Sequence, residues 1–137
     1  MGLIANAWAC GPLDRKMEIQ ITGHRVLVEL AISEQEKACG LAFRDGLDTD
    51  HGMLFVYPNE RDLAFWMKDT RIPLSLAFID SKGAILDIFQ MKAMDTEHFY
   101  RPSAPARFAL EMSENWFLEH RVKPGDRVQI PLAGSAD

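Results

Sequence analysis

A chain of 137 residues is long enough for one ordinary domain with a core that buries about two-thirds of the unfolded surface. Its 47% hydrophobic and 26% charged residues are typical of a globular protein and exclude a disordered or fibrous chain. Fifteen basic residues against twenty acidic residues give a formal net charge of -5, which repels phosphate backbones and disfavours nucleic-acid binding.

The N-terminal residues bear on the cellular compartment of the protein. Ala7-Trp8-Ala9 follows a short apolar run and has the small-x-small form of a secretory cleavage site, although the basic region that usually precedes one is missing. We interpret residues 1–16 as the remnant of a signal peptide or an N-terminal arm. The preferred location is therefore periplasmic or exported, with the cytoplasm as the alternative. No apolar run approaches the ~20 residues of a transmembrane span.

The chain has two cysteines, which are too few for a disulfide-stapled scaffold. We expect Cys10 and Cys39 to be free thiols, with a bridge between them as the alternative in an exported protein. No C-x-x-C motif or Cys/His cluster indicates a metal site.

The first half of the folded region begins with a hairpin, because Met17 to Thr22 and Arg25 to Ile32 both alternate apolar and polar residues. Ser33 and Glu36 have the spacing of a capping box, which predicts a short helix that ends at Gly40. The apolar run 52–57 predicts a strand stopped by Pro58 and followed by a turn over 59–62.

The stretch from Leu63 to Leu76 carries the densest group of chemically capable side chains. Its alternation predicts a strand with Phe65 and Met67 on one face and with Trp66 and Lys68 on the other. Asp69 breaks the pattern before Pro73. We therefore expect Phe65 and Met67 to pack in the core and the opposite face to carry function.

The second half predicts a further hairpin, a long loop, another strand, a helix and a last strand. We expect the hairpin to lie centrally in its sheet, because both of its strands are apolar on both faces. We expect Ser113 to cap the helix. The ranges are 74–79 and 84–91 for the hairpin, 92–105 for the loop, 107–112 for the strand, 113–120 for the helix and 127–132 for the last strand.

About seven short strands and two short helices predict a mainly β fold, as a small β-sandwich or barrel. Residues 17–132 form a single β-rich domain in this interpretation, and residues 133–137 form a disordered tail.

The order and spacing of several segments resemble the bacterial and archaeal domain of unknown function 192 family. The resemblance implies a small, jelly-roll-like β-sandwich or barrel that is often exported, and it implies no activity. Ala42 departs from the methionine usual in the family, and Ser113-Glu114-Asn115 replaces a more glycine-rich stretch. The segments that carry the resemblance are Gly40-Leu41 with Phe43-Arg44, Gly52-Met53-Leu54-Phe55-Val56, Phe65-Trp66-Met67-Lys68 with Thr70, Ile72-Pro73-Leu74, Phe78-Ile79-Asp80 with Gly83, Ala109-Leu110-Glu111 and Lys123-Pro124-Gly125-Asp126-Arg127-Val128.

We interpret the protein as a non-catalytic binding module for a small anionic or saccharide ligand. Arg44 and Lys68 could form a cationic pocket, and Trp66 could stack on a sugar ring. The alternatives are structural ion pairs of these cations with Asp69 and Glu111, and a Trp66 that packs in the core. The expected ligand-binding residues are Arg44, Trp66, Lys68, Asp69, Thr70, Tyr100 and Glu111, with no cofactor, metal or catalytic residue.

Two other classes of function stay open at this stage. The first is a hydrolase that uses Glu111 and Asp69 as a carboxylate pair, with Arg44 stabilising an anion. The second is a protein-interaction domain, which exposed aromatic residues around Phe99-Tyr100 or Trp116-Phe117 would indicate.

Overall fold

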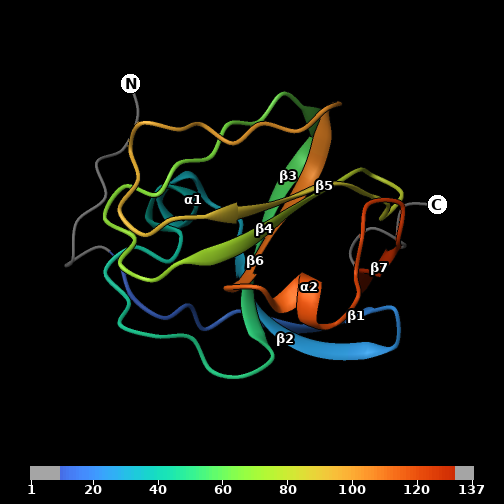
Figure 1. Cartoon of the computed structure of the whole chain (residues 1–137), viewed down its shortest axis with the longest axis horizontal. Helices are drawn as coiled ribbons and strands as arrows, with labels where there is room; N and C mark the ends of the chain where they lie inside the picture. Colours follow the sequence, from blue (N-terminus) through green and yellow to red (C-terminus); the bar gives the residue numbers. More distant parts are fainter. Residues whose placement is uncertain (1–9, 132–137) are drawn as a thin grey trace.

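A computed structural model describes residues 10–131, which form one seven-stranded sheet with the strand order β5-β4-β6-β3-β2-β1-β7 (Figure 1). Two short helices, α1 and α2, accompany the sheet and lie well apart in the view of Figure 1. The strands are β1 (Lys16–Ile21), β2 (His24–Ala31), β3 (His51–Arg61), β4 (Leu74–Ile79), β5 (Ile85–Met91), β6 (Ala106–Ser113) and β7 (Val128–Gln129); the helices are α1 (Glu34–Cys39) and α2 (Trp116–Glu119).

The hairpin β1–β2 and the connection to β3 follow the sequence pattern closely. β1 and β2 pair antiparallel from Lys16 opposite Glu29 to Ile21 opposite His24, and Gly23 turns the chain with φ +87°. β2 then pairs parallel with β3, and α1 lies in the connection between them. A parallel pair needs such a crossover, so the position of α1 beside this part of the sheet follows from the strand order.

The sheet curls until its two ends meet. Val128 of β7 donates to the carbonyl of Gly83 at 2.8 Å, and Ile85 of β5 donates to the carbonyl of Asp126 at 2.9 Å. A β-bridge also joins Ala84 to Arg127. The result is a partly closed barrel, which confirms the predicted mainly β fold with two short helices.

Two hydrophobic clusters lie on the two faces of the curled sheet. One contains residues from both ends of the strand order together with Trp116 and Phe117 of α2, so it fills the inside of the curl. The other contains Leu41, Met67 and the buried residues of β3, β4 and β6 on the opposite face of the sheet, and it lies under the end of α1. Strand β6 serves both clusters, because Phe108 and Leu110 face the first and Ala109 faces the second.

Helix α1 begins with the predicted capping box. Glu36 N–H donates to Ser33 Oγ at 3.1 Å, and the Glu36 carboxylate accepts from Ser33 N–H at 2.9 Å. The backbone N–H groups of Ser33 and Ile32, which donate to the Glu36 carboxylate, lower the pKa of Glu36. Gly40 ends the helix with φ +51°.

Replacing Ser33 with alanine removes one half of this cap and is expected to cost about 1 kcal/mol of unfolding free energy. Urea unfolding measures the loss. Ser113→Ala is the matched control, because the structure places Ser113 at the end of β6 rather than at a helix cap. An equal loss in both variants would contradict the assignment of the cap.

Several predicted boundaries are wrong. β3 continues through Pro58 to Arg61 after a shift in register, because the strand is exposed there and a proline is tolerated at such a bulge. β5 lies at one end of the strand order and not centrally. Helix α2 starts after Asn115, whose φ of +64° turns the chain without a side-chain cap. β7 has only two residues, at 128–129.

The predicted strand over Leu63–Lys68 is also wrong, since that segment forms only a single β-bridge, between Phe65 and Tyr100. The two faces are nevertheless as predicted. Met67 is buried and Phe65 packs against the second cluster, whereas Trp66 and Lys68 are exposed. The alternation therefore predicted where these side chains point but not the backbone pairing.

No helix in residues 10–131 is long and apolar enough to cross a membrane. The expected signal-peptide remnant falls mostly on residues 1–9, and the expected tail is 133–137. Residues 1–9 and 132–137 lie outside the described part of the chain.

Candidate ligand cavity

The candidate functional site is a cavity of about 170 Å³ between α1, β3, β6 and the segment 64–70. Its most deeply buried charged residue is Glu111 of β6, which is 4% exposed and lies opposite Met53 of β3 and Leu76 of β4. Gly52 keeps β3 close to β6, because a side chain there would overlap the carbonyl oxygen of Glu111. The lining is Lys37, Ala38, Cys39, Gly40, Leu41, Phe55, Tyr57, Ala64, Phe65, Trp66, Lys68, Thr70 and Glu111.

The carboxyl group of Glu111 has no hydrogen bond or ion pair within residues 10–131, and burial raises its pKa to about 8. A buried carboxyl without a charged partner favours its neutral form. At neutral pH the floor of the cavity therefore presents an O–H donor and a carbonyl acceptor, both without a partner among residues 10–131.

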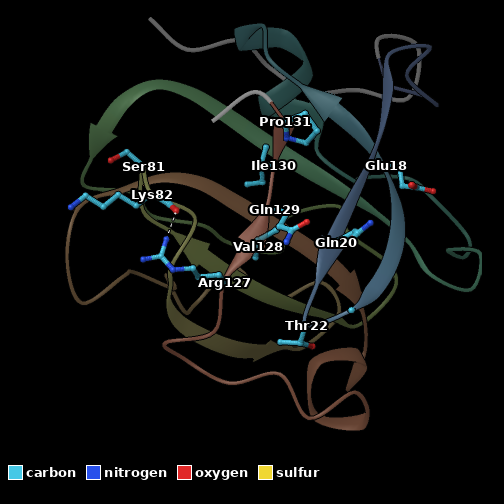
Figure 2. A pocket seen from close by; sticks show the side chains of 11 residues that line it. Glu18, Gln20, Thr22, Ser81, Lys82, Arg127, Val128, Gln129, Ile130 and Pro131 are labelled. Atoms are coloured by element: carbon cyan, nitrogen blue, oxygen red, sulfur yellow. Dashed lines mark hydrogen bonds between the residues drawn. The ribbon is translucent and has the colours of Figure 1, made fainter. Parts of the chain in front are cut away.

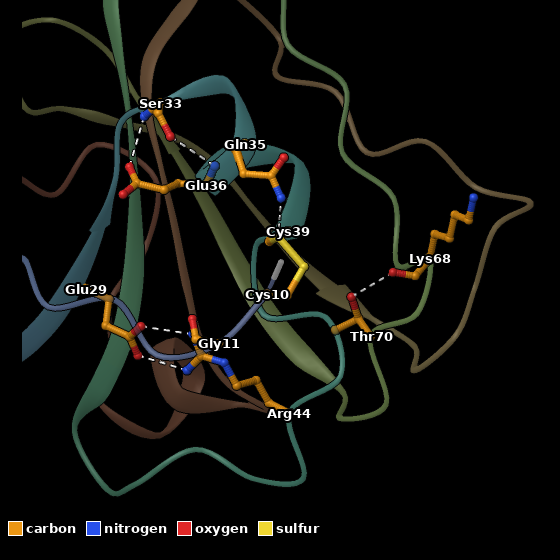
Figure 3. The surroundings of a disulfide bond; sticks show 10 residues. All are labelled: Cys10, Gly11, Glu29, Ser33, Gln35, Glu36, Cys39, Arg44, Lys68 and Thr70. Carbon is orange, nitrogen blue, oxygen red and sulfur yellow. Dashed lines mark hydrogen bonds and ion pairs between the residues drawn. A yellow bond between two sulfur atoms is a disulfide. The ribbon is translucent and has the colours of Figure 1, made fainter. Parts of the chain in front are cut away.

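The other polar groups of the cavity lie nearer its rim. Burial raises the pKa of Tyr57 to about 12, against the opposing charge of Arg61. The Lys37 ammonium lies 4.0 Å from the centre of the Tyr57 ring, and desolvation lowers its pKa. The Thr70 hydroxyl donates to the carbonyl of Lys68 at 3.1 Å (Figure 3). The rim is thus cationic and the floor is neutral.

Trp66 and Lys68 lie together at the mouth. The Lys68 ammonium is 5.7 Å from the centre of the Trp66 ring, which is a cation-π contact. Such a contact follows from the predicted position of both side chains on one face of the segment. Trp66 is 44% exposed and stacks on Phe99, with ring centres 5.4 Å apart and planes inclined by 18°. Phe99 covers part of one face of the Trp66 ring and Lys68 lies over the ring, so only part of Trp66 is open to a ligand.

Arg44 does not reach this cavity. Its guanidinium binds Glu29 in a fork with two N–O distances of 2.9 Å and donates to the carbonyl of Gly11 at 3.0 Å. Both side chains are only 14% exposed, and the hydrogen bond to Arg44 contributes to the lowered pKa of Glu29 despite its burial. Figure 3 shows Lys68 extending away from this pair. Arg44 is thus a structural ion-pair residue, and its partner is Glu29 rather than Asp69 or Glu111.

The structure brings together four of the seven expected site residues, namely Trp66, Lys68, Thr70 and Glu111. Asp69 is outside the lining, where its carbonyl accepts from Phe43 N–H at 2.9 Å, so it forms no carboxylate pair with Glu111 in the cavity. Tyr100 also lies outside, paired with Phe65 and in ring contact with Phe89.

Sequence reasoning missed Lys37 and Tyr57, which line the cavity. Tyr57 shares the alternation of Met53 and Phe55 in β3, which is the signal that could have placed it on this face. The signal for Lys37 was weaker, because its position in the last turn of α1 does not by itself place it at the cavity. Of the two aromatic pairs considered as interaction surfaces, Trp116-Phe117 is buried, whereas Phe99 is 50% exposed.

The expectation of free thiols is wrong, because Cys10 and Cys39 form a disulfide with their Cα atoms 5.4 Å apart (Figure 3). The bridge joins the segment before β1 to the end of α1, and Cys39 also lines the cavity. Gly11 and Leu13 hold the same segment through their bonds to Arg44 and Glu29. The disulfide therefore fixes one wall of the cavity.

A larger hollow of about 1020 Å³ lies beside the short strand β7 (Figure 2). It is lined by β1, by Ser81 and Lys82, and by residues 127–131. The polar side chains in its lining are exposed or half-exposed, and Arg127 donates to the carbonyl of Lys82 at 3.0 Å. In residues 10–131 no group of three or more His, Cys, Asp and Glu side chains is arranged to hold a metal ion. No polar side chain that lines the hollow is as deeply buried as Glu111 in the smaller cavity.

Comparison with known proteins places the chain in one family. A search of curated proteins found no match. The chain is similar to a candidate transcription regulator from Sinorhizobium meliloti 1021, whose crystal structure is known. The two sequences are 32% identical, and the structures superpose with a TM-score of 0.79 over 83% of this chain and 92% of that chain. A protein of unknown function from Novosphingobium aromaticivorans is 29% identical, with a TM-score of 0.78 over 84% of this chain and 85% of that chain. Residues 17–130 match the model of DUF192, described as "Uncharacterized ACR", and the chain belongs to this family.

Proposed function

We propose that the protein is a non-catalytic binding module for a small carboxylate, which enters the cavity and accepts a hydrogen bond from Glu111. The observation that carries the proposal is the Glu111 carboxyl group, which is buried at the floor of a cavity and has no partner among the described residues. A group in this state gains stability from a ligand that accepts its proton in a hydrogen bond.

An anion fits this cavity better than a saccharide. The Lys37 and Lys68 ammonium groups at the rim attract a negative charge, and a neutral Glu111 does not repel it. A saccharide needs an open aromatic face, whereas Phe99 covers part of one face of Trp66. A volume of about 170 Å³ corresponds to the share of about six water molecules in liquid water, which suits a carboxyl group with about three carbons.

Butanoate titrations by calorimetry or amide NMR test the proposal. The wild-type protein is expected to bind butanoate at pH 6 and to lose at least tenfold in affinity at pH 9.5, because Glu111 ionises near pH 8 and then repels the ligand. Glu111→Gln keeps an N–H donor and is expected to lose much less affinity than the wild-type protein between the two pH values, since only the Lys37 ammonium, whose pKa is lowered, changes its charge there. Glu111→Ala is expected not to bind.

Two controls accompany this test. Glu97→Gln removes an exposed carboxylate outside the cavity and is expected to leave both the affinity and its pH dependence unchanged. Butylammonium tests the opposite charge and is expected to bind more weakly than butanoate at pH 6. Equal butanoate affinity in the wild-type and Glu111→Ala proteins would refute the proposal.

The proposal includes an oxidising compartment, such as the periplasm, as the place where the protein works. The support is the Cys10–Cys39 disulfide, since such bridges persist mainly outside the reducing cytosol. Thiol alkylation of the protein in intact cells, followed by mass spectrometry, tests this. Two unmodified cysteines are expected, and two alkylated cysteines would place the protein in a reducing compartment.

A further inference from the structure

Most of the exposed large apolar side chains of the described residues belong to two neighbouring segments beside the cavity. Among residues 10–131, the large apolar side chains that are exposed are Trp66, Met94, Phe99 and Leu118. Three of these four belong to the two neighbouring segments 62–73 and 92–105. Trp66 also lines the cavity, so its ring continues the apolar wall of the cavity onto the surface.

The surface formed by Trp66 and Phe99 is held in place before any ligand binds. Phe65 and Tyr100 exchange two backbone hydrogen bonds, at 2.9 and 2.8 Å, and Met67 N–H donates to the carbonyl of Asp95 at 2.9 Å. These bonds fix the segment of Trp66 against the segment of Phe99. A surface that is ordered in advance spares a ligand the entropic cost of ordering it.

The geometry of this surface selects among apolar partners. Lys68 lies over the Trp66 ring at 5.7 Å, and the Arg101 guanidinium lies over the Phe99 ring at 5.9 Å. Because the two rings also stack on each other, one face of each ring is covered in part, while Trp66 and Phe99 stay 44% and 50% exposed. An alkyl chain can contact this exposed ring surface and the stems of Lys68 and Arg101.

We infer that the ligand is an amphipathic carboxylate, whose carboxyl group enters the cavity and whose alkyl chain leaves it over Trp66 and Phe99. The inference rests on the proposed function and adds the chemical class of the ligand. The cavity accommodates the carboxyl group and the first carbons, so the remaining methylene groups emerge at the mouth. There they cover the exposed surface of the two rings.

Affinities of butanoate, hexanoate and octanoate for the intact protein test the inference, measured by calorimetry at pH 6. In the wild-type protein the affinity is expected to rise with chain length, by up to about fourfold for each methylene group that becomes buried. Phe99 lies outside the cavity lining, so Phe99→Ala is expected to bind butanoate like the wild-type protein. The same variant is expected to lose about half of the gain between butanoate and octanoate.

Leu118→Ala is the matched control, because Leu118 is exposed on α2 and its removal is expected to change none of the three affinities. Butanoate binding that depends on Glu111, together with an affinity that does not rise with chain length, would overturn the inference and leave the proposed function standing. An equal rise in the wild-type and Phe99→Ala proteins would also overturn it. Failure of all three acids to bind would overturn both.

Discussion

Replacing Glu111 with glutamine is expected to remove a large pH dependence from the stability of the protein. Burial raises the pKa of Glu111 from 4.5 to about 8 in the folded state. Between these two values the folded protein holds a proton that the unfolded chain has released. Stability therefore falls as the pH rises from about 4.5 to about 8 and is constant, with respect to this group, above that window.

The size of the effect follows from about 1.4 kcal/mol for each unit of difference in pKa. Relative to Glu111→Gln, the wild-type protein is expected to lose about 3 kcal/mol between pH 4 and pH 7, and about 5 kcal/mol by pH 9. Urea unfolding of both proteins at the three pH values measures this difference, in which the other titrating groups cancel. A difference that stays constant with pH would mean that Glu111 titrates normally in the folded protein.

Removing the disulfide is expected to destabilise the protein by about 3 to 4 kcal/mol. Cys10 and Cys39 are 29 residues apart, and cross-linking a loop of this length lowers the entropy of the unfolded chain by that amount. The double variant Cys10→Ser, Cys39→Ser should therefore unfold at a lower urea concentration than the oxidised wild-type protein. The hydrogen bonds of Gly11 and Leu13 to Arg44 and Glu29 remain available in the variant.

The reduced wild-type protein provides the control for this experiment. In an excess of reductant its unfolding midpoint is expected to fall to that of the double variant, while the variant itself does not respond to reductant. Equal midpoints for the oxidised wild-type protein and the variant would show that the bridge contributes no stability.

Local patterns predicted most of the fold, because the relevant contacts lie close in the sequence. The hairpin β1–β2 forms between adjacent strands joined by a tight turn, and the cap of α1 forms between residues three positions apart. Both are present in the structure. The segment Leu63–Lys68 differs, since its neighbour is the aperiodic loop 92–105 and not a strand. Alternation shows which side chains face the core, but a strand also needs a continuous partner.

Some residues of the cavity lining were predicted for the same reason. Glu111 stands out as a carboxylate within the apolar run from Phe108 to Met112, and its position on β6 places it under α1. The partner of Arg44 depended instead on a distance in space, which spacing along the chain does not give. Glu29 lies 15 residues before Arg44. In the alternating sequence of β2 it is the polar residue between Val28 and Leu30, with nothing in the spacing to indicate Arg44.

The carboxyl carbon of Glu111, observed by NMR across a pH titration, tests the central claim most directly. In the protein without ligand, the change in the chemical shift of this carbon is expected to have its midpoint near pH 8. Saturating butanoate is expected to move the midpoint higher, because a carboxylate that accepts the Glu111 proton in a hydrogen bond binds the protonated form more tightly. A midpoint near 4.5 in the protein alone, or one that falls or stays constant when butanoate is added, would contradict the account.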